Sequence, residues 1–247
     1  MSSSYPDFPP AEPGRSSALI AASTVILVRD VEAADDTGGM VEVLMLQRVS
    51  RGAFAGMWVF PGGKVDPEDR VNIADIELAS ELATARTAAA REAREETGLV
   101  VDPLRMAALS HWMPPPTEAR RFSTWFFVAP APSGAIELSV GEATDHRWIT
   151  PETALAANSA AEFPLAPPTW TTLHQLSGAA SVGHLLDRLR TEASPRMHTR
   201  VIANDPLTLA WAGDVAYELP DHALDPAHSG PRHRLTLAKS GWTYENS

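Results

Sequence analysis

The sequence predicts an α/β fold of the α+β kind, in which helices flank a mixed β-sheet. Short apolar runs of strand length recur along the 247 residues, separated by turns that suit hairpins rather than regular βαβ units. One long Ala-rich segment, residues 73–97, contains good helix formers and neither Pro nor Gly. No internal repeat is visible. These observations favour a mixed sheet with a few helices over a regular parallel sheet or a repeat array.

The expected elements follow one another along the chain. Strands are expected at 24–28, 41–48, 57–60, 104–112, 121–128 and 146–150, with a hairpin loop at 35–39 after the first. Helices are expected at 73–97, 151–158, 168–176 and 181–192. Gly98 directly follows the longest helix, where a residue in the left-handed conformation usually ends the element. Beyond Pro195 the chain turns strand-like again, at 199–203, 207–219 and 234–238.

Three regions are expected from these patterns. Residues 1–17 are rich in Ser and Pro and predict a disordered tail. Residues 18–195 form the main domain, and 196–247 form a C-terminal helical and β extension packed on the same domain. The apolar run at 18–28 is too short to span a bilayer and lacks the basic stretch and cleavage pattern of a signal peptide. A cytoplasmic protein is therefore expected.

Composition restricts the chemistry. The 20 Lys and Arg residues against 31 Asp and Glu give a formal net charge of −11, which disfavours a nucleic-acid polymer or an anionic membrane as partner. The chain contains no Cys, which excludes disulfides, thiolate nucleophiles and Cys-ligated metals. A metal would bind to oxygen or imidazole. An anionic small molecule stays compatible with the acidic chain, because a bound divalent cation reverses the local field.

Three glutamates share one stripe near the C-terminal end of the expected long helix. Because each helical residue advances about 100°, Glu92 and Glu96 lie about 40° apart and Glu95 lies about 60° to the other side. The C-terminal end of a helix already carries partial negative charge, so the stripe calls for a cation, and oxygen ligands suit Mg²⁺ or Mn²⁺. Arg91 stands four residues before Glu95 and could hold its carboxylate. A solvated helix face is the alternative interpretation.

The segment around this stripe resembles the signature of the Nudix hydrolases, Gly-x5-Glu-x7-Arg-Glu-U-x-Glu-Glu-x-Gly-U, where U is aliphatic. Gly63 matches the first glycine, and the second half is matched by Arg91, Glu92, Ala93, Glu95, Glu96, Gly98 and Leu99. Asp69 occupies the position of the early Glu, and 21 residues rather than 7 separate it from Arg91. The motif at 63–99 therefore carries an insertion at about 70–83. The resemblance covers residues from about 18 to about 155.

The resemblance implies a fold and a reaction. The fold is the Nudix-type mixed sheet sandwiched between helices, and the reaction is metal-assisted hydrolysis of a nucleoside diphosphate linked to another group. The metal set it implies is Glu92, Glu96, the carbonyl of Gly63, and Glu95 as a ligand or as a partner of one. Metals that bridge a diphosphate neutralise its charge and orient a water for in-line attack.

A further carboxylate is expected from a loop outside the helix. Glu142 stands six residues before Trp148, and Nudix proteins often carry a Glu shortly before a Trp-containing strand. We expect Glu142 to bind the metal or to act as general base, with Asp145 as second choice and Glu95 as the base if neither serves. An ordinary loop acid is the alternative interpretation of Glu142.

One Nudix branch matches more closely. Residues 47–48, 52–66, 111–114 and 121–127 resemble the branch with an interrupted motif that includes peroxisomal coenzyme A diphosphatases. Cationic side chains expected to bind the substrate phosphates are Arg48, Lys64, Arg120 and Arg121. Trp112 could stack on an adenine, as could Trp125, although core packing is an equal alternative for Trp112.

The substrate expected from this branch is coenzyme A or an acyl thioester of it, cut to 3′,5′-ADP and (acyl-)phosphopantetheine. ADP-ribose, dinucleotides or nucleotide sugars are alternative substrates with the same mechanism. A non-catalytic nucleotide-binding Nudix module is an alternative of another class. The expected partner is a small nucleotide diphosphate, and a homodimer is left open.

Overall fold

The computed structural model describes residues 18–31, 40–51, 54–74 and 76–247. The predicted tail and the predicted hairpin loop lie outside these residues. The strands of the main sheet are β1 (Leu19–Val31), β2 (Met40–Arg48), β3 (Trp58–Val59), β4 (Gly62–Lys64), β5 (Ala107–Met113), β6 (Arg121–Pro130), β7 (Ala143–Ile149) and β8 (Arg196–His198). The α-helices are α1 (Glu77–Thr97), α2 (Pro151–Ser159), α3 (Pro167–Leu176) and α4 (Val182–Thr191). Short 3₁₀ turns are η1 (Pro67–Asp69), η2 (Pro103–Arg105) and η3 (Asp221–Ala223).

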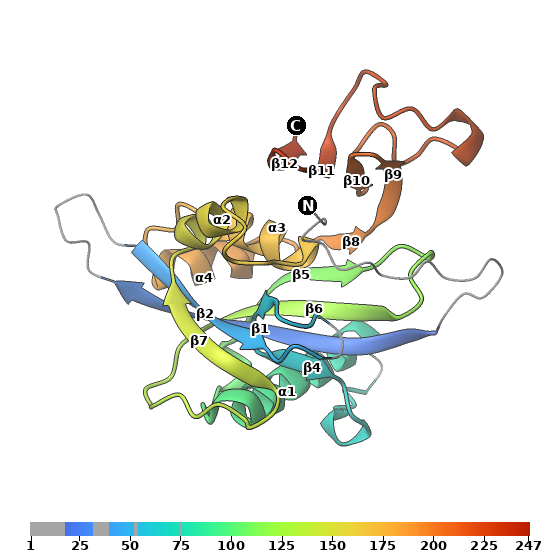
Figure 1. The fold of residues 1–247 in the computed structure, drawn as a ribbon. Helices are drawn as coiled ribbons and strands as arrows, with labels where there is room; N and C mark the ends of the chain where they lie inside the picture. The colour runs from blue at the N-terminus through green and yellow to red at the C-terminus, as the bar shows by residue number, and fades with distance from the viewer. Residues whose placement is uncertain (1–17, 32–39, 52–53, 75) are drawn as a thin grey trace.

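β1 is the central strand of the main sheet (Figure 1). One of its edges pairs in parallel with β6, and its other edge pairs antiparallel with β4 near its start and with β2 near its end. β7 adds to β2, while β5 and β8 extend the sheet beyond β6. The sheet is therefore mixed, as the sequence predicts, and β1 lies between β4 and β6.

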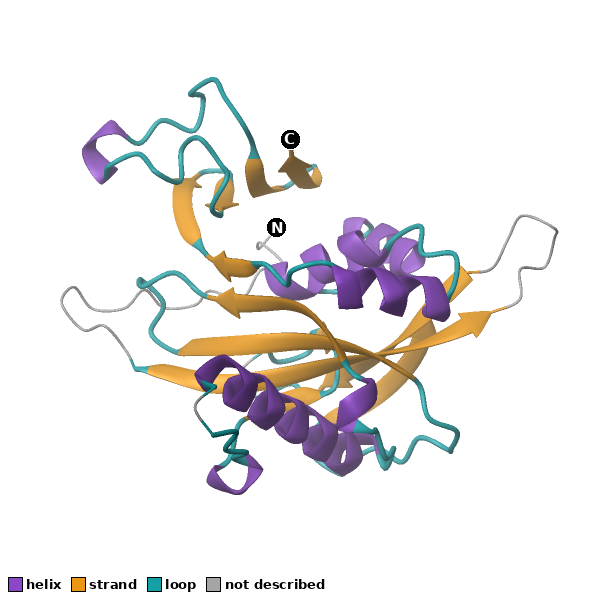
Figure 2. Ribbon diagram, turned by 180° about the vertical axis from the view of Figure 1, so that it is seen from behind, coloured by secondary structure: helices purple, strands orange, loops and turns teal. Residues whose placement is uncertain are grey.

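Helices cover both faces of this sheet (Figure 2). α1 packs on one face through its small buried residues Ala85, Ala89 and Ala93, which let the helix approach the strands closely. α2, α3 and α4 lie on the opposite face, over a second hydrophobic cluster. Gly98 ends α1 in the left-handed conformation with φ 74°, which confirms the predicted stop.

The insertion lengthens α1 at its start. The helix begins at Glu77, slightly later than predicted, and the described residues 70–74 and 76 before it belong to no helix or strand. Ser80 accepts a hydrogen bond from the Ile73 N–H at 2.8 Å, and Thr84 accepts one from the Val71 N–H at 2.9 Å. These bonds to side chains satisfy backbone groups that have no partner in a strand or helix.

The C-terminal extension forms a second sheet of four antiparallel strands, β9 (Arg200–Asn204), β10 (Leu207–Ala210), β11 (His233–Ala238) and β12 (Gly241–Asn246). β8 and β12 were not predicted. The strand predicted at 207–219 ends at Ala210, because a turn from Trp211 to Asp214 follows and Gly213 has φ 98°. The domain division of the sequence analysis stays a prediction.

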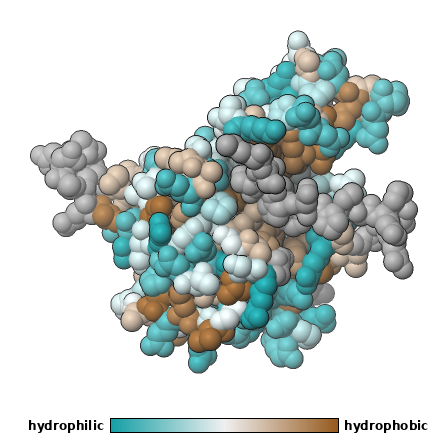
Figure 3. Space-filling view, in the orientation of Figure 1, coloured by the Kyte–Doolittle hydropathy of each residue, from teal (hydrophilic) through white to brown (hydrophobic). Residues whose placement is uncertain are grey.

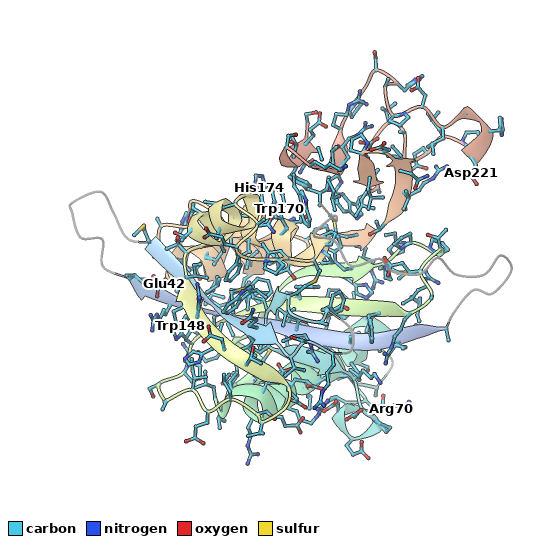
Figure 4. All side chains as sticks on the ribbon, viewed as in Figure 1. Glu42, Arg70, Trp148, Trp170, His174 and Asp221 are labelled. Atoms are coloured by element: carbon cyan, nitrogen blue, oxygen red, sulfur yellow. The ribbon has the colours of Figure 1, made fainter. Side chains whose placement is uncertain are left out.

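Aromatic side chains join the extension to the main body. Trp211 is fully buried and meets Trp112 edge-on at 5.2 Å. Trp170 and His174 of α3 lie toward the second sheet (Figure 4), and the ring centroid of Trp242 lies 6.0 Å from that of Trp170.

On the face of the molecule seen in Figure 3, hydrophobic residues are interspersed among hydrophilic ones. No helix of the described residues is both long and apolar enough to cross a membrane.

Trp211→Ala should destabilise the fold by about 3–5 kcal/mol, because it empties a fully buried site and leaves Thr199 without its indole partner. Urea denaturation measures this difference. Leu104→Ala, at a side chain 92% exposed, is the control and should change stability little. A loss below about 1 kcal/mol for Trp211→Ala would contradict the packing described here.

Candidate active site

The three glutamates of α1 differ in exposure. The side chains of Glu96 and Glu92 are 7% and 17% exposed, whereas that of Glu95 is 56% exposed. Glu92 and Glu96 thus face the sheet, and Glu95 lies at the edge of the stripe. Two partly buried carboxylates side by side are unfavourable without compensating charge.

The Gly62–Gly63 turn lies directly against this pair. β4 pairs with residues 22–24 of β1, which brings the Gly62 N–H to 2.9 Å from Glu96 Oε2. A Cβ on Gly63 would overlap the carboxylate of Glu92. Glycine is therefore required here for close approach of the backbone to the glutamates.

Arg91 connects the helix to the glycine loop. Its guanidinium donates to Asp69 Oδ1 and Oδ2 at 3.0 and 2.9 Å, to Glu92 and Glu95 at 2.9 Å each, and to the Lys64 carbonyl at 2.9 Å. Burial alone would raise the pKa of Asp69, but the hydrogen bonds from Arg91 and from the Asp66 N–H hold it below its usual value. The ion pair of Arg91 with Asp69 therefore joins the two parts of the motif that the insertion separates in sequence.

A loop after β6 brings Glu142 to the same place. The N–H groups of Glu137 and Ser139 donate to the carbonyls of Thr97 and Glu96, which ties the loop to the end of α1. The Val49 N–H donates to the Glu142 carbonyl at 3.1 Å, just after β2. The negative charge of Glu142 contributes to raising the pKa values of Glu92 and Glu96.

Burial is the main reason why the pKa values of Glu92 and Glu96 are raised. It raises the pKa of Glu96 to about 7, against the Gly62 N–H and Arg48, which favour the charged form. Burial also raises the pKa of Glu92, and Arg91 only partly offsets this. A divalent cation among these carboxylates would favour their ionised forms and lower both pKa values.

The donor set fits a hard divalent cation. It consists of carboxylate oxygens and a glycine backbone that approaches them without a Cβ between. Among the residues that the structure describes, no three acidic or histidine side chains are already gathered at metal-binding distance. Arg91 and the Gly62 N–H bind the carboxylate oxygens instead.

A family model described as the NUDIX domain matches residues 22–169, more than half of the chain. The chain belongs to the Nudix family. This makes it a Nudix pyrophosphohydrolase that acts on nucleoside-diphosphate-linked substrates, and enzymes of this family generally use divalent metal ions.

Solved Nudix structures resemble the chain. A Nudix hydrolase from Alicyclobacillus acidocaldarius has a TM-score of 0.59 and 21% identity over 70% of this chain and 97% of that one, which supports the fold. A MutT protein from Methanosarcina mazei Go1 has a TM-score of 0.44 and 20% identity over 72% and 100% of the two chains. The Nudix domain of Shewanella oneidensis NrtR, complexed with ADP ribose, has a TM-score of 0.43 and 20% identity over 67% of this chain and 90% of that one. No match was found among curated proteins.

The cations predicted to bind substrate fall into two groups. Arg48 lies at the carboxylates, with Nη1 3.7 Å from Glu96 Oε1, and Lys64 belongs to the glycine strand. Arg121 pairs with Leu19, four residues along β1 from the Ser23 that pairs with Gly63, which places it about 13 Å away along the strand. Arg120 precedes it and lies over the Phe122 ring.

The structure does not support Trp112 as a binding residue. Its side chain is 4% exposed, and its indole N–H donates to Ser110 Oγ at 3.1 Å. It packs against Trp211, so the core alternative accounts for it. Trp125 is also buried and donates to Glu81.

Sequence reasoning missed two contacts at the site. The Gly62 N–H bond to Glu96 and the ion pair of Arg48 with Glu96 depend on the pairing of β4 with β1. β4 has only three residues, two of them glycine, and therefore carries no strand pattern. The Pro-Gly-Gly turn was the available signal.

Gly63→Ala should displace the Glu92 carboxylate and weaken Mg²⁺ or Mn²⁺ binding by about tenfold or more while the fold persists. Isothermal titration calorimetry with Mn²⁺ measures the affinity. Gly183→Ala is the matched control, because nothing lies within 4 Å of a Cβ there. Unchanged affinity in Gly63→Ala would contradict the described contact.

Glu96→Gln should stabilise the metal-free protein at alkaline pH. The carboxyl of Glu96 has a pKa of about 7 when folded and about 4.3 when unfolded, so wild type loses stability as pH rises through this interval. The amide avoids that loss and can still accept the Gly62 N–H. Differential scanning fluorimetry in chelator should show the variant melting several degrees higher near pH 8, with a smaller gap near pH 5. A wild type that melts higher near pH 8 would contradict the assignment.

Proposed function

We propose that this chain is a coenzyme A or acyl-coenzyme A diphosphatase, which releases 3′,5′-ADP and (acyl-)phosphopantetheine. The observation that carries the proposal is the interrupted motif. An insertion separates Asp69 from Arg91, yet their side chains meet at 2.9 Å and the glycine turn still lies against Glu92. An interruption at this place, after a Gly-rich segment ending Phe60–Lys64, is the feature by which the sequence resembles the coenzyme A diphosphatase branch.

In this proposal, Glu92, Glu96 and the Gly63 carbonyl hold Mg²⁺ or Mn²⁺, and Glu95 is a ligand or supports one. The cation supplies charge neutralisation on the diphosphate and a more acidic bound water. Arg91 positions Glu92 and Glu95 through its hydrogen bonds, because one guanidinium fixes both carboxylates.

The cations near the carboxylates bind the substrate phosphates in this proposal. The Arg48 side chain is 30% exposed and its Nη1 lies 3.7 Å from Glu96 Oε1, so its guanidinium retains donors for a phosphate oxygen. Lys64 is exposed beside the glycine turn and can reach the same group. Arg120 and Arg121 stand farther along the sheet, where they could meet only a distant part of a long substrate.

Glu142 is proposed as general base or as an additional ligand. Its loop is tied to the end of α1, and its charge influences both Glu92 and Glu96. Asp145 is instead engaged by the His146 N–H at 2.8 Å and by Arg147 at 3.7 Å. A carboxylate that a cation and a backbone N–H already engage is the poorer proton acceptor, which favours Glu142 over Asp145 as base.

The alternatives keep the same cluster. ADP-ribose, a dinucleotide or a nucleotide sugar would use the same ligands with a different subsite. A module that binds nucleotides without hydrolysing them does not need a buried carboxylate pair. Burying the charged form of these carboxylates is unfavourable, as the raised pKa of Glu96 indicates. A cytoplasmic enzyme is proposed, and a homodimer is left open.

A substrate panel tests the proposal. The protein is incubated with Mg²⁺ or Mn²⁺ and with coenzyme A, an acyl-coenzyme A, ADP-ribose, a dinucleotide or a nucleotide sugar, and the products are separated by chromatography. We expect 3′,5′-ADP from the coenzyme A compounds at the highest kcat/KM. Equal turnover of every compound, or no turnover of either coenzyme A or the acyl-coenzyme A, would reject the proposal.

Glu142→Gln should lower kcat by about 10²-fold or more and leave KM nearly unchanged, because a base acts mainly in the transition state. Asp145→Asn is the matched control and should be mild, since Arg147 and a backbone N–H already engage that carboxylate. Steady-state kinetics at saturating metal give both values. A damaging Asp145→Asn beside a silent Glu142→Gln would reverse the two roles, and two silent variants would move the base to Glu95.

A further inference from the structure

The insertion presents aliphatic side chains to solvent. Val71, Ile73, Ile76 and Leu78 are 36%, 38%, 55% and 49% exposed. Four such side chains within eight residues of one segment are unusual, because exposed aliphatic residues normally occur singly. We call these four residues the insertion ridge.

The backbone of the ridge is held in place by polar bonds. Besides accepting the Ile73 N–H, Ser80 donates from its hydroxyl toward the carbonyls of Ile73 and Ile76, both at 3.1 Å. Val71 lies against Thr84 and Ile73 against Ser80, so the segment runs antiparallel along the first turns of α1. The chain is therefore anchored by its polar groups while its apolar side chains point to solvent.

One end of the ridge adjoins the carboxylate cluster. Val71 is two residues after Asp69, which binds Arg91, and Arg91 binds Glu92. Arg70, which stands between Asp69 and Val71 in the sequence, projects beside η1 in Figure 4. Along the helix, Thr84 beside Val71 lies about 12 Å from Glu92 and Leu78 about 21 Å, at 1.5 Å a residue. The ridge thus extends from the edge of the site along α1.

Two other occupants fit the ridge less well. A stable self-interface buries about 800 Å² on each partner, which four half-exposed aliphatic side chains fall far short of. An anionic membrane surface is disfavoured because Glu68, Glu77 and Glu81 flank the ridge. An aliphatic chain attached to the substrate requires little area and carries no charge there.

We propose that the insertion ridge binds the acyl chain of an acyl-coenzyme A while the diphosphate lies at Glu92 and Glu96. This inference rests on the proposed function. The acyl group is the uncharged end of the molecule and lies far from the diphosphate, and the ridge correspondingly extends along α1 to Leu78, about 21 Å from Glu92. The insertion then selects substrates by chain length and takes no part in the hydrolysis.

The test compares chain-length dependence in two proteins. KM and kcat are measured for free coenzyme A and for its thioesters with short, medium and long saturated chains, in wild type and in the triple variant Ile73→Ser, Ile76→Ser, Leu78→Ser. For wild type we expect KM to fall about tenfold from free coenzyme A to the long chain, since partial burial of a few methylenes suffices. The triple variant should lose this fall and keep its kinetics on free coenzyme A.

The control is Val100→Ser with Leu104→Ser, which removes exposed aliphatic side chains 72% and 92% exposed elsewhere on the surface. It should keep the chain-length dependence. Hydrolysis of coenzyme A with a KM independent of chain length, or a dependence that survives in the triple variant, would overturn the inference alone. No hydrolysis of any coenzyme A compound would overturn the proposed function and the inference with it. A wild-type dimer that becomes a monomer in the triple variant, by light scattering, would identify the ridge as a self-contact and overturn it as well.

Discussion

The ion pair of Arg91 with Asp69 is the interaction on which the arrangement of the site depends. One guanidinium joins η1, the glycine strand and two glutamates of α1, so the loop and the helix cannot shift independently. Asp69 is only 3% exposed, and an ionised carboxylate at that depth needs a cationic partner. The insertion is tolerated because it leaves the chain between these two side chains free to extend outward along α1.

The cost of the site is the burial of negative charge. Glu92 and Glu96 lie against the sheet and near Glu142, and burial raises the pKa values of both. The only nearby compensation in the described residues comes from Arg91, Arg48 and backbone N–H groups. Unfavourable burial of charge is typical of a site built for a ligand rather than for stability. The carboxylates that destabilise the metal-free fold are the groups that stabilise a bound cation.

Local signals predicted much of this structure. The Ala-rich helix and its end at Gly98 follow from propensity and from the left-handed stop, and the glutamate stripe follows from helical geometry. The contact of Trp112 with Trp211 could not be predicted, because the two residues lie 99 positions apart and a strand pattern in the extension does not show which residues of the main body it packs against. The position of Glu142 was expected from family resemblance. The hydrogen bonds that fix its loop join backbone groups, and such bonds cannot be predicted from residue types. The short strands β4 and β8 are set by tertiary pairing alone.

The central claim is that Glu92, Glu96 and the Gly63 carbonyl together hold the catalytic cation. A crystal of the protein grown with Mn²⁺ and the nucleotide product tests it most directly, by anomalous difference density collected at the manganese edge. The account predicts a peak within about 2.0–2.3 Å of oxygens from Glu92, Glu96 and Gly63, the range of hard-cation coordination. A fully occupied peak elsewhere, with Glu92 still bound by Arg91 and Glu96 still bound by Arg48 and the Gly62 N–H, would contradict it.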